Sequence, residues 1–129
     1  MKTRHDIPPI FYKLKEKFSV EWGKVIVAHY PDIFCAVDIP EQKYVHEEVH
    51  LDRQKVMGVG EWWGKYLTDE AFRLNEEVLA YRTEIEWIKK NVPLRNERRY
   101  LLNLIYSDLA SYVYGNIISE AEAKKLCTA

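Results

Sequence analysis

Two of the chain's four histidines stand four residues apart in the run His46-Glu47-Glu48-Val49-His50, which has the pattern H-E-x-x-H. On a helix, side chains four apart share one face, with their Cβ atoms roughly 5–6 Å apart, so both imidazoles can bind one metal ion. Glu47 lies about 100° round the helix, close enough to that ion to accept a proton from a water molecule bound to it. The spacing therefore predicts a metal centre with a neighbouring general base.

Two imidazoles need a further ligand, because a catalytic zinc usually has three protein ligands and one open position for water. No cysteine or further histidine lies conveniently downstream, so we expect a carboxylate. Glu70, Glu77 and Glu84 lie seven apart along one border of the apolar stripe of the next long predicted helix, and this geometry does not choose among them. Glu76 is predicted to point away from that stripe and is a poor candidate.

The apolar patterns of the segments around these residues predict an α+β fold, mostly α. The length predicts a single domain over residues 1–129. Short β-branched runs predict a small N-terminal hairpin with strands at 24–30 and 33–37. We expect this small sheet to pack on the helix that carries the histidines, with two further long helices beyond it. The predicted helices span 10–18, 39–57, 61–67, 70–90, 94–114 and 119–126.

The boundaries of the histidine helix follow from its flanking residues. Asp38 is a good N-cap, and Gly58 is a natural C-terminal stop, so both histidines fall where the backbone is stiff. Asp69 or Thr68 can cap the helix at 70–90, and Ser119 with Glu122 forms a capping box for the last helix. The long helices present two apolar faces, namely Ala71, Leu74, Val78, Tyr81, Ile85 and Ile88, and then Leu101, Ile105, Leu109 and Tyr112.

The composition is that of an ordinary globular protein, with 47% hydrophobic and 30% charged residues and a formal net charge of −1. This charge gives no reason to expect nucleic acid as a partner. Arg95, Arg98 and Arg99 cluster at a helix start, where we expect ordinary solvated surface, with a phosphate site as the alternative.

The location predicted from the sequence is the cytoplasm. Two lone cysteines, Cys35 and Cys127, fit a reducing compartment better than a disulfide scaffold. The N-terminus does not read as a secretory leader, and no apolar run approaches the roughly 18 residues that a membrane span needs. His29 at a strand end and His5 in a frayed terminus are expected to be incidental, and Trp62 with Trp63 is expected in the core rather than along a cleft.

The stretch from residue 46 to residue 82 resembles the compact gluzincin-type zinc metallopeptidase domains of bacterial and phage origin. In such domains H-E-x-x-H is followed on the next long helix by an E-x-x-A block, here Glu77-Val78-Leu79-Ala80, continued by Tyr81 and Arg82. A glutamine after the histidine motif, Gln54, and the Trp62-Trp63 spacer fit the same pattern. The likeness covers little more than a quarter of the chain.

The resemblance implies a minimal zincin-like fold and a zinc-dependent peptidase that acts on a peptide or protein substrate. It makes His46, His50 and Glu77 the ligands of one Zn²⁺ per chain, and Glu47 the general base of a zinc-activated water. In such domains the strand beside the active-site helix pairs with extended substrate, a role that the predicted hairpin would fill.

The electrophile that stabilises the transition state is left open. Larger gluzincins often carry an aspartate four residues after the glutamate ligand, where this chain has Tyr81. Its hydroxyl could orient a histidine or stabilise an oxyanion, although a tyrosine in an apolar stripe is more often part of the core. Arg82, His29, Tyr106 and Tyr112 are the other candidates.

Two other readings compete with the peptidase. The first is a non-catalytic zinc-binding module on the same scaffold, against which Glu47 weighs because a structural zinc needs no base. The second is a helical protein-interaction module without metal. Asn103, Ser107 and Ala110 form a small-residue strip on the third long helix that would permit close packing in a homodimer.

Overall fold

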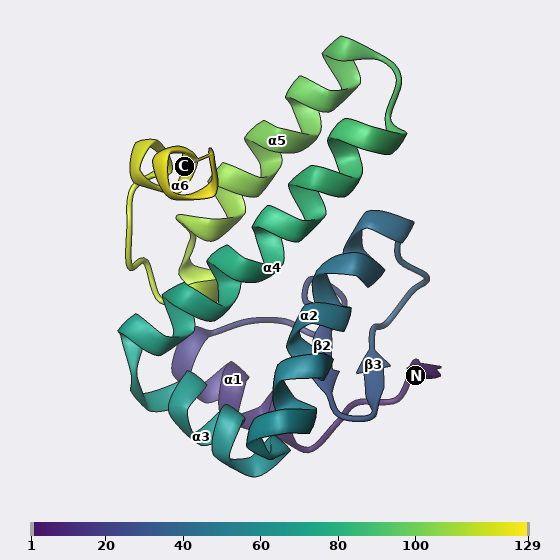
Figure 1. Ribbon diagram of the computed structural model, residues 1–129. Coiled ribbons are helices and arrows are strands. Elements are labelled where there is room, and N and C mark those ends of the chain that lie inside the picture. Colours follow the sequence, from purple (N-terminus) through teal and green to yellow (C-terminus); the bar gives the residue numbers. More distant parts are fainter. Residues whose placement is uncertain (1, 129) are drawn as a thin grey trace.

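The computed structural model describes residues 2–128, which form a mostly helical fold with a small three-stranded sheet (Figure 1). The α+β, mostly-α fold class is thus confirmed. The elements in chain order are β1 (Lys2–Arg4), α1 (Ile10–Phe18), β2 (Val27–His29), β3 (Asp32–Phe34), α2 (Glu41–Met57), α3 (Val59–Thr68), α4 (Glu70–Asn91), α5 (Arg95–Leu109), the 3₁₀ turn η1 (Tyr112–Tyr114) and α6 (Glu120–Thr128).

The sheet contains the predicted hairpin, shorter than expected, and one strand that the sequence did not reveal. β2 and β3 pair antiparallel with Ala28 opposite Ile33. β1 lies parallel to β3 on its other side, with Thr3 opposite Ile33. The expectation of a frayed terminus around His5 was therefore wrong. The Cys35 amide donates to the carbonyl oxygen of Arg4 at 2.9 Å, which continues the pairing, and Nδ1 of His5 is 2.8 Å from the carbonyl oxygen of Cys35.

Most helix boundaries match the predicted ones, and the two clear errors are the start of α2 and the end of α5. Helix α1 has its predicted bounds, and α2 ends before Gly58, whose positive φ of 102° suits glycine. The N-cap prediction for Asp38 was wrong, because Pro40 is still extended (ψ 159°) and α2 begins at Glu41. Asp69 caps α4 by accepting from the Phe72 amide, as predicted.

Helix α5 is shorter than the apolar periodicity suggested. It ends at Leu109, and the backbone then turns through Ser111 into the 3₁₀ turn before reversing at Gly115, where φ is 95°. Tyr112 is 47% exposed, so its predicted place on a buried helix face was wrong. The turn instead directs Tyr114 toward α4, where it reaches the site described below.

Helix α4 lies at the centre of the molecule. It packs against α2 and α3 on one side and against α5 and α6 on the other, and the sheet lies beyond α2 (Figure 1). The first side is an aromatic core that includes Phe11, Phe18 and Trp62, and the second is an aliphatic core that includes Ile88, Ile105 and Leu109. Within residues 2–128 there is no helix of the length and apolarity that crossing a membrane requires.

Candidate metal centre

His46 and His50 lie in the middle of α2 on the face that packs against α4. Only 3% of each residue is exposed, and the ring centroids are 5.0 Å apart. The shared helix face predicted from the H-E-x-x-H spacing is therefore present, and it is buried. The same i, i+4 step continues to Gln54, which is 1% exposed.

Gln54 joins α2 to the β2–β3 hairpin through hydrogen bonds. Its amide Nε2 donates to the carbonyl oxygen of Ala28 at 2.9 Å, and its Oε1 accepts from the backbone amide of Tyr30 at 2.7 Å. The indole Nε1 of Trp63 donates to the same Ala28 oxygen at 3.2 Å. Since side chains already use this carbonyl, an extended substrate could not bond to it, which restricts the expected main-chain recognition along β2.

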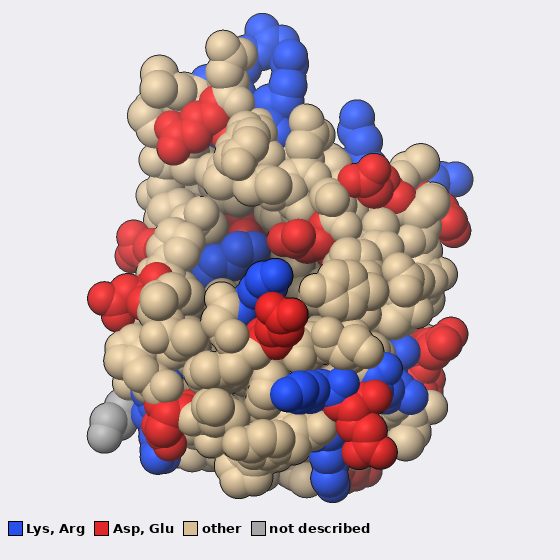
Figure 2. All heavy atoms as spheres, turned by 180° about the vertical axis from the view of Figure 1, so that it is seen from behind, with Lys and Arg blue, Asp and Glu red and all other residues tan. Residues whose placement is uncertain are grey.

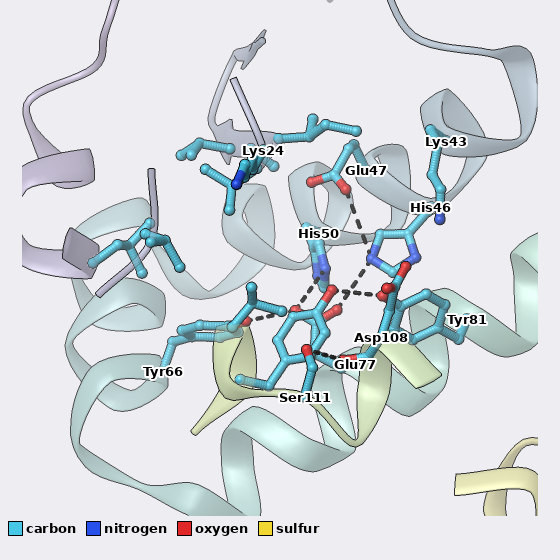
Figure 3. A pocket seen from close by; sticks show the side chains of 18 of the residues that line it. Lys24, Lys43, His46, Glu47, His50, Tyr66, Glu77, Tyr81, Asp108 and Ser111 are labelled. Atoms are coloured by element: carbon cyan, nitrogen blue, oxygen red, sulfur yellow. Dashed lines mark hydrogen bonds and ion pairs between the residues drawn. The ribbon is translucent and has the colours of Figure 1, made fainter. Parts of the chain in front are cut away.

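Glu77 of α4 lies directly opposite the two histidines (Figure 3). Its Oε1 is 3.1 Å from Nε2 of His46, and its Oε2 is 3.2 Å from Nε2 of His50. Each carboxylate oxygen thus faces one imidazole nitrogen. Among the three carboxylates that helix geometry left open, Glu77 is the one that contacts both Nε2 atoms, whereas Glu70 is exposed at the start of α4.

Glu47 completes the buried cluster from the histidine helix itself. Its Oε2 is 3.7 Å from Nε2 of His46, and the residue is 6% exposed. One potential ligand atom from each of His46, Glu47 and His50 lies within 4.8 Å of the others, so this buried group can hold a metal ion. Two imidazole nitrogens and a carboxylate are the donor set of many catalytic zinc sites.

The pKa values reflect how tightly these charges are packed. Burial alone would lower the pKa of His46, but the carboxylates of Glu47, Glu77 and Glu84 raise it to about 10. Burial opposes ionisation of Glu77, yet the nearby imidazoles of His50 and His46 hold its pKa well below the usual range. Without a divalent cation, a proton on the imidazole balances the carboxylates, and metal binding would displace it.

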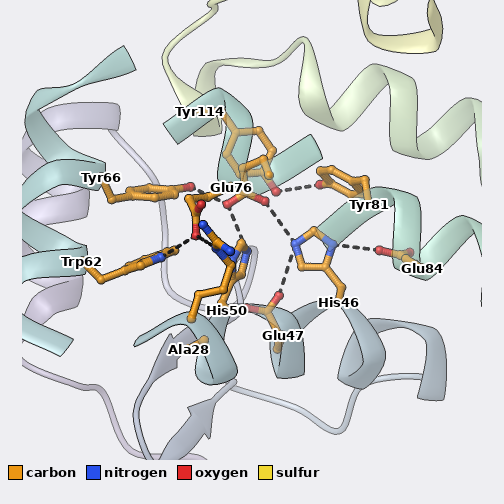
Figure 4. Close-up of polar contacts among 12 residues, drawn as sticks. Ala28, His46, Glu47, His50, Trp62, Tyr66, Glu76, Tyr81, Glu84 and Tyr114 are labelled. Carbon is orange, nitrogen blue, oxygen red and sulfur yellow. Dashed lines mark hydrogen bonds and ion pairs between the residues drawn. The ribbon is translucent and has the colours of Figure 1, made fainter. Parts of the chain in front are cut away.

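Glu84 acts on the outer side of His46 rather than on the side that faces Glu77 (Figure 4). Its Oε1 is 3.0 Å from Nδ1 of His46, and its Oε2 forms an ion pair with Nζ of Lys43 at 2.9 Å. A carboxylate on the non-ligating nitrogen fixes the tautomer and the ring orientation of a metal-binding histidine. Sequence reasoning counted Glu84 as a possible ligand and did not foresee this role.

Glu76 was predicted to point away from the apolar stripe of α4, and the residue is nevertheless fully buried. Its Oε1 accepts from the indole Nε1 of Trp62 at 2.8 Å and from Nε of Arg53. The reason is that α2 and α3 both cover α4, so that the helix has a buried polar side next to its apolar stripe. Glu76 contributes to this packing and makes no ion pair with either histidine of the site in the described residues.

Three tyrosines surround Glu77, and the sequence analysis singled out one of them. The hydroxyl of Tyr66 donates to Oε2 of Glu77 at 2.7 Å. The hydroxyls of Tyr81 and Tyr114 lie 2.6 Å apart, and the Tyr81 ring stands edge-on to His46 with centroids 4.3 Å apart. Burial raises the pKa of each of the three phenols. All of them therefore stay protonated and can donate hydrogen bonds at the site.

The positions of Tyr66 and Tyr114 at the site were not predicted from the sequence, for different reasons. Tyr66 follows Trp62 at i+4 on α3, a spacing that could have placed both side chains on one face. Tyr114 reaches the site only because the chain turns after α5, and no local pattern signals that turn.

The cluster opens into a cavity of about 390 Å³. Figure 2 shows the molecule hollowed near the centre of this view, with basic and acidic side chains around the hollow. Apolar side chains from β2 and the preceding segment line one part of the cavity, while Lys43 and Asp108 lie near His46 (Figure 3). Trp62 and Trp63 are 1% and 6% exposed, which confirms their predicted place in the core, although both also border the cavity.

The remaining candidates for the electrophile lie in different places. Tyr112 borders the cavity from the 3₁₀ turn, whereas His29, Arg82 and Tyr106 are not among its lining residues. The two cysteines, Cys35 and Cys127, are buried as free thiols and take no part in the site. The side chains that form ion pairs with His46 and His50 in the described residues are all glutamates.

No family model, no curated protein and no solved structure matches this chain. The resemblance to gluzincin-type peptidases therefore stays a prediction. The evidence for a metal centre is the geometry of His46, Glu47 and His50.

Proposed function

We propose that the protein is a zinc-dependent peptidase that hydrolyses peptide bonds, similar to the compact gluzincin-type domains. The observation that carries the proposal is the placement of Glu47. Its buried carboxylate lies beside two imidazoles that already have a second carboxylate, Glu77, in contact with both Nε2 atoms. A centre that only held a metal would have no use for this additional acid next to a cavity.

We assign His46, His50 and Glu77 as the ligands. Glu77 is preferred to Glu47 as the third ligand because its oxygens lie 3.1 and 3.2 Å from the two Nε2 atoms, whereas Glu47 approaches His46 alone, at 3.7 Å. Nitrogen and carboxylate donors without thiolate suit a catalytic Zn²⁺. When bound there, the ion supplies Lewis acidity and lowers the pKa of water at its open position.

Other side chains transfer the proton, orient His46 and donate a hydrogen bond to the substrate. Glu47 accepts the proton of the attacking water and delivers it to the leaving amine. Glu84, neutralised by Lys43, keeps the His46 ring in the orientation that exposes Nε2. Tyr66 already donates its one hydroxyl proton to Glu77. The donor to the substrate carbonyl is therefore sought in the Tyr81–Tyr114 pair, where only one of the two hydroxyls donates to the other and the second keeps its proton.

The competing function is a zinc-binding module without catalysis, and it is separated from the peptidase by a matched pair of variants. Elemental analysis of the purified protein should find about one zinc per chain. Glu47→Gln should keep that zinc and lower hydrolysis of a peptide library by at least ~100-fold, as expected for loss of a general base. Glu48→Gln, at the exposed neighbouring position, is the control and should leave hydrolysis unchanged.

Two results would contradict the proposal. Protein that contains no zinc after purification and reconstitution would remove the metal centre. Equal hydrolysis by the Glu47→Gln and Glu48→Gln variants would remove Glu47 as the base.

A further inference from the structure

A second cavity, of about 310 Å³, lies between α5 and α6, away from the metal centre. We call it the basic cavity, because four cationic side chains line it. Arg95, Arg98 and Arg99 come from the first turns of α5, and Lys124 comes from α6. No acidic residue is among its lining residues in the described part of the chain, although the whole chain carries a net charge of −1.

Unlike Lys43 and Arg53, these cations have no carboxylate opposite them. At the metal centre Lys43 is 2.9 Å from Glu84, and on α2 Arg53 pairs with Glu76. Within residues 2–128, Arg95, Arg99 and Lys124 form no ion pair. Four like charges gathered around one cavity repel each other, and a bound anion would remove that repulsion.

Two of the side chains that line the basic cavity, Arg98 and Tyr106, are held in place or largely buried. Nη1 of Arg98 donates to the carbonyl oxygens of Val92 and Pro93, both at 2.8 Å, which holds its guanidinium in place. Tyr106 is only 7% exposed, and its hydroxyl has no hydrogen-bond partner among the residues described. Tyr106 lines the same cavity as Arg99 and Lys124. An anion in the cavity would accept a hydrogen bond from this hydroxyl.

We propose that the basic cavity is a binding site for a phosphate group. Arg95, Arg99 and Lys124 neutralise its charge, and Tyr106 donates a hydrogen bond to one of its oxygens. Guanidinium groups match phosphate oxygens in pairs, which favours phosphate over a monovalent anion such as chloride. The site is independent of the proposed peptidase activity, because the two cavities share no lining residue.

The test is a calorimetric titration of the intact protein with inorganic phosphate, at low ionic strength and against chloride of matched ionic strength. We expect saturable binding at one site per chain. Arg99→Gln and Lys124→Gln should each weaken it at least ~5-fold by removing one charge contact. The control is Lys13→Gln, which removes an exposed charge from α1 and should change the dissociation constant less than twofold.

Tyr106→Phe separates binding from folding. It removes a hydroxyl that has no partner among the described residues, so the denaturation midpoint should stay unchanged while phosphate affinity falls several-fold. No saturable binding, or an equal loss in the Lys13→Gln variant, would overturn the proposal.

Two sources of phosphate can be told apart with the same variants. Binding of inorganic phosphate in solution, without preference for phosphatidic acid vesicles over phosphatidylcholine vesicles, identifies a free phosphate or a phosphorylated small molecule. Binding to phosphatidic acid vesicles that Arg99→Gln abolishes, together with weak binding of inorganic phosphate, identifies a lipid headgroup. Vesicle binding that Arg99→Gln leaves intact would argue against the basic cavity.

Discussion

At the interface of α2 and α4, imidazoles and carboxylates of opposite charge face one another in the interior, whereas the cavity between α5 and α6 gathers cations alone near the surface. His46 is within 3.1 Å of both Glu77 and Glu84, but Arg99 has no ion-pair partner in the described chain. Buried charges must be balanced within the molecule, while charges near the surface can be balanced by solvent or by a ligand. The difference indicates that the first region is organised to hold a cation and the second to receive an anion.

The largest expected effect is loss of the third ligand. Glu77→Ala removes the carboxylate that contacts both Nε2 atoms and should weaken zinc binding by at least ~100-fold. Glu70→Ala, at an exposed position on the same helix, is the matched control and should bind zinc normally. Competition with a chromophoric chelator measures both affinities. A larger loss in Glu70→Ala than in Glu77→Ala would reverse the ligand assignment.

Loss of the Glu84 charge should weaken zinc binding less than loss of Glu77, because Glu84 orients a ligand and does not bind the ion itself. Glu84→Gln keeps a hydrogen-bond acceptor near Nδ1 of His46 but removes the charge that Lys43 neutralises. We expect zinc affinity to fall by about 10- to 100-fold, as is typical when a carboxylate that orients a ligating histidine is lost. The same chelator competition measures it. An effect as large as that of Glu77→Ala would indicate that Glu84 is itself a ligand.

Glu77 and Glu84 also show which part of the site could be predicted from the sequence. The H-E-x-x-H spacing was enough to predict that the two histidines share a helix face. The heptad spacing of Glu70, Glu77 and Glu84 limited the choice of the third ligand to three positions. Which of the three faces the histidines depends on how α4 crosses α2, and no pattern within either segment encodes that angle. The choice of Glu77 came from the resemblance of its E-x-x-A block.

The errors in the fold have equally local causes. β1 is only three residues long, and its single strand-favouring residue, Thr3, lies between two cations, which is too little to predict a strand. It is held by pairing with β3, far along the chain. The helix predicted at 94–114 continued past Leu109 because Tyr112 kept the apolar period, although the backbone turns before it. Both errors arise where contacts distant in sequence decide the structure.

Gln54 offers a test of how the hairpin is held against the metal-binding helix. Gln54→Leu should leave the Tyr30 amide and the Ala28 carbonyl without this partner in a partly or fully buried setting. The free energy of unfolding should fall by about 1–3 kcal/mol. Urea denaturation measures it, and Gln42→Leu, a partly exposed glutamine on the same helix, is the comparison. Equal stability of both variants would show that the hairpin does not depend on this contact.

The prediction furthest from the metal centre concerns Cys127, in the aliphatic core under α6. Burial raises its pKa to about 11, from a usual value of 9.0, so its thiolate is scarce in the folded protein. Because the folded pKa is the higher one, this thiol contributes stability below about pH 9, and the contribution is lost as the pH rises toward 11. At pH 8, alkylation of Cys127 should be about 100-fold slower in the folded than in the unfolded chain, as peptide mass spectrometry can measure. Equal rates would show that the Arg82 guanidinium, which lowers this pKa, outweighs the effect of burial.

A crystal structure of the protein grown with zinc tests the central claim most directly. The account predicts one ion between α2 and α4, with Nε2 of His46, Nε2 of His50 and a carboxylate oxygen of Glu77 each about 2.0–2.2 Å away, and with a solvent molecule at the fourth position beside Glu47. An ion whose fourth position is filled by Glu47, or an ion bound elsewhere, would contradict it.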